Sequence, residues 1–169
     1  ATRTWAAVEI TPHGSQASTT RPPFMDMFKN HLLTAADCSF EASSICSWTK
    51  VGAGTTVWTR GGSSGTPSSG TGPSSAKEGN YFMFMECTNG DEGDIAYLTS
   101  PSIDTSTNAA MTFWYSCYGS DVGSLSVEIQ SPSGSGSWSS VYTACSSDLG
   151  NTWFQSSSIA LSSYSGSAV

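Results

Sequence analysis

The sequence predicts an all-β protein, an antiparallel β-sandwich with jelly-roll character and a short N-terminal arm that contains a helical turn. From Cys38 onward, short apolar or alternating runs are separated by stretches rich in Gly, Ser, Asn and Asp, which is typical of short strands joined by turns. Charged residues make up only 11% of the 169 residues, well below the charged fraction of an ordinary soluble domain. Such a chain lacks the Glu and Lys that give helices a polar surface, so strands and turns must supply that surface.

Residues 1–37 differ from the rest and are expected to form an arm or linker ahead of a sandwich domain at 38–169. Thr4–Ile10 can extend as a short strand, and Thr11–Pro23 is expected to be a loop. Apolar residues then recur at helical spacing in FMDMFKNHLL, which predicts one or two helical turns. A helix this short is only marginally stable by itself in water. Its apolar stripe is therefore expected either to pack on its own domain or to dock on a partner. The candidate partner-binding residues are Phe24, Met25, Met27, Phe28 and Leu32.

Six runs after Cys38 are predicted strands, namely Tyr81–Cys87, Ile95–Thr99, Met111–Tyr118, Leu125–Gln130, Val141–Cys145 and Trp153–Leu161. Alternate residues from Phe113 to Cys117 and from Leu125 to Ile129 are expected to form core. The glycines of the intervening YGSDVG can close a hairpin between these two strands. The low-complexity stretch 61–75 is expected to be a mobile surface loop.

Charge and hydropathy exclude several partners. The net charge is -7 and the six basic residues are scattered, which argues against nucleic acid and against a basic membrane-surface patch. No run of about 20 apolar residues is present, so no direct membrane span is expected. The chain begins at Ala1 without Met, which suggests a processed product or a fragment.

The five cysteines indicate an oxidising compartment, either extracellular or lumenal. No pair has C-x-x-C spacing, and His13 and His31 do not fit a metal-finger pattern. Structural disulfides are therefore expected, with buried free thiols as the alternative. Because five is odd, at least one thiol lacks a partner within the chain.

A series of segments, in order over about 130 residues, resembles the MAM domain family. They are CSFEASSICSW (38–48), Trp58, Gly72-Pro73, GNYFMFM (79–85), EGDIAYLTSP (92–101), MTFWYSCYGSDVGSLSVEI (111–129) and WFQSSSIALSSYSGSAV (153–169). The resemblance implies a non-catalytic jelly-roll module that mediates adhesion, homophilic contact or subunit assembly. Glu41, Trp48 and Trp58 are expected to be structural, with Glu41 accepting backbone hydrogen bonds.

The resemblance also implies a disulfide between Cys38 and Cys46, the family's first pair. The family's third cysteine would fall near Ala110 and its fourth beyond Val169, so its second disulfide is absent. Cys87 and Cys117 both end predicted strands and are expected to pair, which leaves Cys145 free or bonded outside the chain. The last family strands also fall beyond Val169, so another chain could complete a sheet edge.

One cluster of carboxylates is a candidate ion site. Glu86, Asp91, Glu92 and Asp94 surround a turn, and hard oxygen ligands in such a turn can bind calcium. The alternative is a solvated hairpin tip in which Asp and Asn simply favour turns. No other cofactor is predicted.

No catalytic residue is predicted, and the chain is not expected to be an enzyme. Residues 61–65 match G-x-S-x-G, but they lie in a Ser/Gly run without the strand and helix that a nucleophile elbow needs. The sequence therefore predicts a protein-protein interaction or adhesion module, including the specific hypothesis of an accessory scaffold subunit in a larger extracytoplasmic or lumenal membrane assembly. The alternatives are a carbohydrate-binding jelly roll, suggested by Trp5, Trp114, Trp138 and Trp153, and a non-catalytic domain of a larger secreted enzyme.

Overall fold

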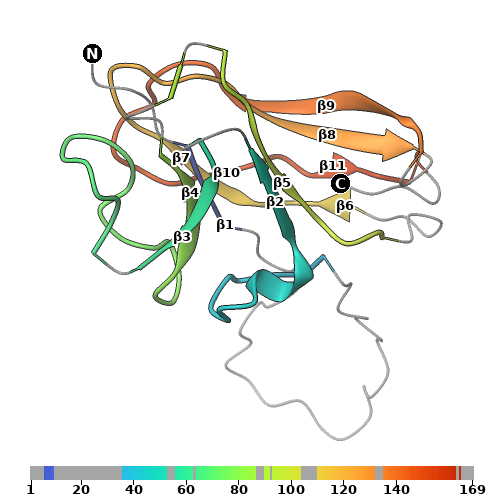
Figure 1. Cartoon of the computed structure of the whole chain (residues 1–169), viewed down its shortest axis with the longest axis horizontal. Helices are drawn as coiled ribbons and strands as arrows, with labels where there is room; N and C mark the ends of the chain where they lie inside the picture. Colours follow the sequence, from blue (N-terminus) through green and yellow to red (C-terminus); the bar gives the residue numbers. More distant parts are fainter. Residues whose placement is uncertain are drawn as a thin grey trace, which may run out of the picture.

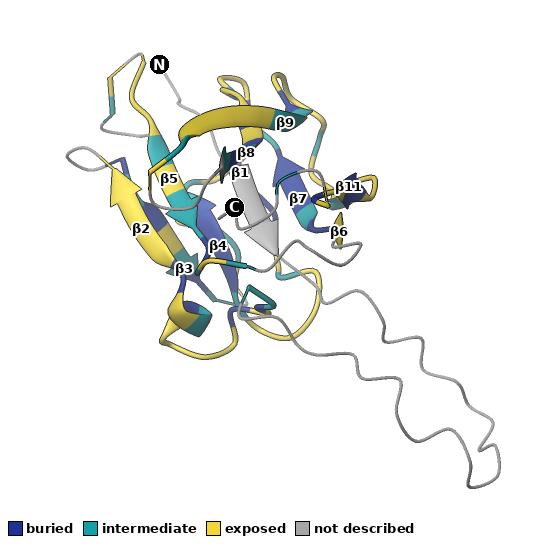
Figure 2. Cartoon of the chain, turned by 90° about the vertical axis from the view of Figure 1, so that its right-hand side faces the viewer, coloured by how far each residue is buried: buried dark blue, intermediate teal, exposed yellow. Residues whose placement is uncertain are grey.

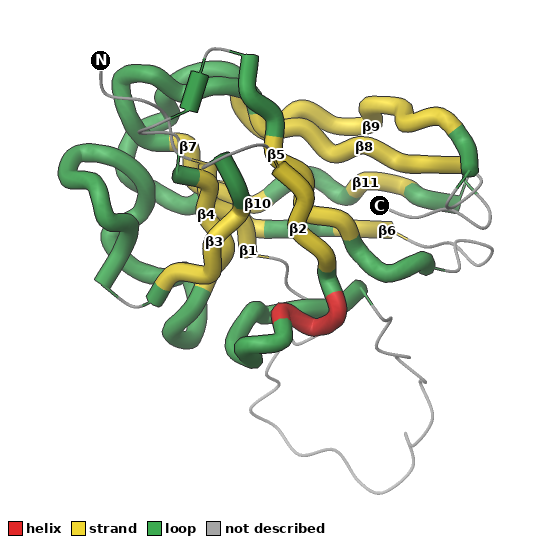
Figure 3. Tube along the Cα trace, in the orientation of Figure 1, coloured by secondary structure: helices red, strands yellow, loops and turns green. Residues whose placement is uncertain are grey.

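The computed structural model describes residues 6–9, 36–52, 56–62, 64–86, 90–91, 93–103, 110–131, 135–162 and 164 (Figure 1). Within these residues the fold is all-β, apart from the 3-10 helix η1 (Ile45–Ser47), which precedes β2 (Figure 3). The strands are β1 (Ala6–Glu9), β2 (Thr49–Gly52), β3 (Trp58–Gly61), β4 (Phe82–Met85), β5 (Ala96–Thr99), β6 (Ala110–Met111), β7 (Trp114–Cys117), β8 (Leu125–Ser131), β9 (Ser137–Cys145), β10 (Phe154–Gln155) and β11 (Ile159–Ala160). All described strand pairs are antiparallel, which confirms the predicted fold class.

A five-stranded sheet, in the order β10-β7-β1-β4-β3, forms one layer of the sandwich. Its middle strand, β1, comes from the N-terminal segment and pairs with β4 on one side and β7 on the other (Figure 1). The described part of the predicted arm is therefore an internal strand of the sandwich. A strand was expected at Thr4–Ile10, but its place in the sheet was not, because pairing over so long a sequence separation leaves no local signal.

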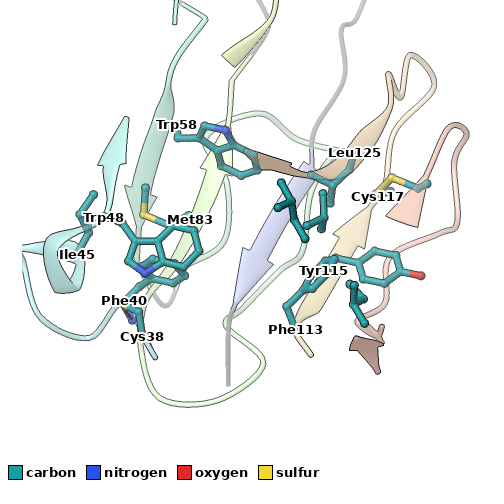
Figure 4. Close-up of a cluster of buried hydrophobic side chains, with 14 of the residues drawn as sticks. Cys38, Phe40, Ile45, Trp48, Trp58, Met83, Phe113, Tyr115, Cys117 and Leu125 are labelled. Carbon is teal, nitrogen blue, oxygen red and sulfur yellow. Dashed lines mark hydrogen bonds between the residues drawn. A yellow bond between two sulfur atoms is a disulfide. The ribbon is translucent and has the colours of Figure 1, made fainter. Parts of the chain in front are cut away.

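The main core lies between this sheet and the two-stranded sheets β8-β9, β11-β6 and β2-β5, counted over the described residues. Met83 and Tyr115 contribute from the five-stranded sheet and Leu125 from β8 (Figure 4). Val127 and Ile129 of β8 belong to the same core. Both faces expected to form core are thus buried, as alternation with a period of two residues predicts.

The expected hairpin between β7 and β8 is wrong. β7 pairs with β1 and β10, whereas β8 pairs with β9. Both strands present buried faces to the same core, so the connection at 118–124 passes from one layer to the other. Likewise, the single run predicted at Trp153–Leu161 is divided into β10 and β11, which belong to different sheets. The sequence periodicity identified the buried faces but not the pairing partners.

In the described part of the low-complexity stretch, residues 64–70 are exposed or half-buried, as expected of a surface loop, whereas residues 71–73 are held against the domain. Thr71, Gly72 and Pro73 are buried, and Gly72 N–H donates to the Tyr118 carbonyl at 2.9 Å. The Trp153 indole donates to the Ser75 carbonyl at 3.0 Å. The segment therefore lies over a small second cluster that contains Phe82 and Phe84.

Candidate interaction surface

Glu41 joins the loop after Cys38 to the turn before β4. Its Oε1 accepts hydrogen bonds from the backbone N–H groups of Asn80 (2.9 Å) and Tyr81 (2.8 Å). The hydrogen bond from Asn80 contributes most to lowering the pKa of Glu41, and the Tyr81 N–H and the charge of Arg60 act in the same direction. These contacts confirm the expected structural role of Glu41.

Arg60 completes this framework from β3. Its Nε donates to the Phe40 carbonyl at 2.7 Å and a terminal nitrogen donates to the Glu41 carbonyl at 2.6 Å. The guanidinium lies 3.3 Å above the centre of the Tyr81 ring. The planar guanidinium of Arg can donate hydrogen bonds and stack on an aromatic ring at the same time, which the ammonium group of Lys cannot do. The residues of the signature motifs near Cys38 and Tyr81 therefore hold loops in place.

Two disulfides fix the described part of the fold. Cys38 and Cys46 are bonded, with Cα atoms 5.6 Å apart. Cys117 at the end of β7 is bonded to Cys145 at the end of β9, with Cα atoms 6.6 Å apart. This pairing corrects the expected Cys87–Cys117 bond, and Cys87 itself lies outside the described residues. The sequence showed that these cysteines end strands, but only the tertiary structure brings the ends of β7 and β9 together.

The carboxylates of the candidate ion site do not gather in the described structure. Asp94 Oδ2 accepts hydrogen bonds from Thr56 Oγ1 and from the Asp91 backbone N–H, both at 2.9 Å, so it stabilises the turn before β5. Among the described residues, no group of three or more His, Cys, Asp or Glu side chains is arranged to hold a metal ion. Glu92 lies outside those residues, so the calcium site, which also includes Glu86, stays a prediction.

The β2–β5 ribbon carries an exposed apolar face. Val51 is 58% exposed and lies directly opposite Tyr97, which is 45% exposed. Ile95, 59% exposed, immediately precedes β5, and extending the two-residue alternation of the strand places it on the Tyr97 side. Thr49 and Thr99 form the next pair along the same face. We call these five residues the β2–β5 face.

The five residues of the β2–β5 face are uncharged, and the strand β5 that carries part of the face is packed against the main core. On the opposite side of β5, Ala96 and Leu98 pack against the main core, and the Trp58 indole donates to the Ala96 carbonyl at 3.1 Å. β2 is exposed along its whole length in Figure 2. Apolar side chains grouped on an uncharged surface are a feature of protein-binding sites.

The sequence did not reveal this face. Thr49–Gly52 was not predicted as a strand, and Ile95–Thr99 carries apolar side chains on both sides, so its pattern does not distinguish an inner from an outer face. Only the cross-strand register Val51–Tyr97 shows that the exposed residues lie together.

The tryptophans divide clearly by exposure. Trp48 and Trp58 are buried, and their indole N–H groups donate to backbone carbonyls. Trp114 and Trp153 are half-buried, and the Lys77 ammonium lies 4.4 Å from the centre of the Trp114 ring. Of the tryptophans that the structure describes, only Trp138 on β9 is exposed, at 43%. Trp5 is outside the described residues.

The candidate partner-binding stripe at Phe24, Met25, Met27, Phe28 and Leu32 also lies outside the described residues and stays a prediction. In the part of the chain that the structure describes, no helix has the length and apolar character needed to cross a bilayer.

Comparison with known proteins identifies the family. The sequence model of the MAM domain, meprin/A5/mu, matches residues 38–167. Among curated proteins, neuropilin-1a of Danio rerio is 32% identical over 94 residues, which cover 54% of this chain and 10% of that protein. The matched part is therefore only about a tenth of that relative's length. No solved structure matches this chain significantly. The β-sandwich and the family match together show that the chain belongs to the MAM domain family, a family of protein-interaction modules.

Proposed function

We propose that this MAM domain acts without catalysis, as an adhesion or assembly module that holds protein partners through the β2–β5 face. The observation that carries the proposal is the exposure of Val51, Ile95 and Tyr97 on one uncharged side of an anchored ribbon. Each of these side chains is about half-exposed, so burying it against a partner would recover about half of the roughly 1.5–3 kcal/mol that full burial of an apolar side chain gives, before the costs of association.

The ribbon is suited to this role because its geometry is set before a partner arrives. Trp58 and Leu98 hold β5 against the core, so a partner would not have to order the strand on binding. Tyr97 lies opposite Val51 across the ribbon, and Ile95 precedes it just before β5 begins. An aromatic residue surrounded by smaller apolar groups is a frequent source of binding energy in protein interfaces.

The compartment and the setting extend the proposal. Two disulfides are consistent with an oxidising compartment, extracellular or lumenal. We place the module there as an accessory scaffold subunit of a membrane assembly, attached through its protein partners. This setting, like the partner's identity, is part of the proposal.

The direct test measures self-association and partner binding with charged variants of the β2–β5 face. Beads coated with the folded chain are expected to aggregate, or to retain a partner from the native preparation that is then purified and titrated. Val51→Asp, which places a charge beside Tyr97, and Tyr97→Ala are each expected to weaken binding about 30-fold, since a central hot spot contributes roughly 2 kcal/mol.

Leu149→Asp is the matched control. Leu149 is 37% exposed and lies outside the β2–β5 face, so the same change of chemistry there should leave binding intact. Circular dichroism and melting temperatures of all three variants should match the parent. Equal losses from Leu149→Asp and Val51→Asp, or no loss from either β2–β5 variant, would exclude the β2–β5 face as the binding surface.

A second candidate function rests on Trp138. An exposed indole on β9 can stack on a sugar ring, which favours the carbohydrate-binding alternative. A glycan array with the parent chain and Trp138→Ala tests it. Binding that is present in the parent and lost in Trp138→Ala would favour this alternative, and an array without hits would remove it.

A further inference from the structure

The middle strand of the five-stranded sheet is supplied by a distant part of the chain. β1 is hydrogen-bonded on both edges, with Ala7 opposite Phe84 of β4 on one side and opposite Ser116 of β7 on the other. In the described part of the chain, β4 and β7 are the two strands that pair with β1. Without β1, these two strands would expose two unpaired edges that face each other across a gap one strand wide.

The donor strand and the acceptor strands lie in different segments of the sequence. The MAM domain match begins at residue 38, so β4 and β7 lie inside it whereas β1 lies outside it. Residues 10–35 connect β1 to the next described residue, Ala36, and a connection of that length can span up to about 90 Å when extended. The covalent connection therefore does not require β1 to fill the gap of its own chain.

We propose that the gap between β4 and β7 is a strand-acceptor site, and that the Ala6–Glu9 segment of a second copy occupies it in a strand-exchanged dimer. Exchange would be reciprocal, so each copy would donate β1 and receive its partner's. The pairs formed are those seen within one chain, such as Ala7 with Phe84 and Ser116. Exchange therefore keeps every described strand pair of β1, and concentration decides between the two forms.

The proposed dimer is independent of the β2–β5 face, since it uses backbone pairing in another sheet. It goes beyond the proposed function because the two copies are joined by exchange of β1 and not by contact between folded surfaces. A tethered strand has an effective concentration on the order of 1 mM, so exchange is favoured where copies are crowded at comparable concentrations.

Disulfide trapping tests the proposal with the full chain. In a Cys87→Ser background, one chain carries Ala7→Cys and another, of different size through a tag, carries Ser116→Cys. Ser116 is fully buried and its Oγ has no hydrogen-bond partner in the described structure, so its replacement by Cys breaks no hydrogen bond. Residues directly opposite in antiparallel strands have the Cα spacing that a disulfide needs. The mixture is unfolded, refolded together in a glutathione buffer and analysed on a non-reducing gel.

The expected result is a mixed disulfide dimer whose yield rises with chain concentration and exceeds that of a mismatched pair by about tenfold. The mismatched pair is Glu9→Cys with Ser116→Cys, because Glu9 lies opposite Trp114 and not Ser116. The single-chain variant Ala7→Cys/Ser116→Cys serves as the register control and should close within one chain at low concentration.

Three outcomes would overturn the proposal. One is closure of the single-chain variant without any mixed dimer at chain concentrations on the order of 1 mM. Another is equal cross-linking by the matched and mismatched pairs, which would indicate random thiol collisions. The third is failure of the single-chain variant to close, since the register would then not form. Adding Val51→Asp should leave cross-linking unchanged, so failure here and failure of the β2–β5 face remain distinguishable.

Discussion

The Glu41 carboxylate accepts a 2.8 Å hydrogen bond from the backbone N–H of Tyr81, a residue 40 positions further along the chain. Glu41 follows the first cysteine of the Cys38–Cys46 disulfide, and Tyr81 immediately precedes β4. The contact therefore joins the loop at the start of the family match to the sheet that contains β1. It involves a carboxylate, so it depends on pH.

Glu41→Gln should lower the free energy of unfolding by about 1 kcal/mol at pH 7, a value discounted because the carboxylate is exposed. The pKa of Glu41 is lowered in the folded state from an ordinary value of 4.5, so its stabilisation is present above that value and is lost as pH falls through the folded pKa. Urea unfolding of both proteins from pH 7 to pH 3 should show the difference shrinking towards zero. A difference that does not change with pH would contradict this account.

Gly79→Ala should destabilise the fold by about 2–3 kcal/mol. Gly79 has a φ of +64°, and an added Cβ would lie 2.5 Å from Glu41 Oε1, so the carboxylate would have to leave its two backbone donors. The control is Gly70→Ala, where φ is +76° but nothing lies within 4 Å of the added Cβ. It should cost only about 1 kcal/mol, the price of the left-handed backbone alone. Equal thermal shifts for the two variants would rule out a specific contact with Glu41.

Ser47→Gly should stabilise the protein by up to about 1 kcal/mol. Ser47 is exposed and has a φ of +68°, within a turn in which Ile45 and Cys46 also have positive φ. Glycine adopts this conformation without the steric cost that Ser bears. At Ser44, also exposed but with a φ of -69°, the same change should lower the melting temperature, because there glycine only adds freedom to the unfolded chain. Matching shifts in one direction would argue against left-handed strain at Ser47.

Replacing Cys117 and Cys145 together by Ala should lower the free energy of unfolding by about 3.5 kcal/mol, because their bond closes a loop with a sequence separation of 28. The Cys38/Cys46 double variant, with a separation of 8, should lose about 2.5 kcal/mol in the same loop-closure account. Guanidinium unfolding of the two variants tests the order. Peptide mapping of the intact protein should recover a Cys117–Cys145 peptide, and a Cys87–Cys117 peptide would contradict the pairing.

Local patterns were sufficient for the fold class and for much of the core. Alternation placed Tyr115, Val127 and Ile129 on buried faces, and turn residues marked most strand ends, because both signals depend on neighbours a few residues away. The same patterns missed β2, whose four residues are all exposed and carry no inward apolar alternation. They also gave Cys117 the wrong partner, Cys87, because the sequence identified strand ends but not which ends meet.

Sequence alone was enough to identify the chain as all-β, acidic and cysteine-containing, with MAM signatures. Composition and short-range periodicity are properties of the unfolded polymer as much as of the fold. The three-dimensional arrangement was needed for everything that depends on residues far apart in the chain. Those features are β1 between β4 and β7, the Cys117–Cys145 bond, and Val51 beside Tyr97 on an exposed face. Each arises from long-range pairing, which is decided by the packing of the whole sandwich and leaves no mark in any short window of sequence.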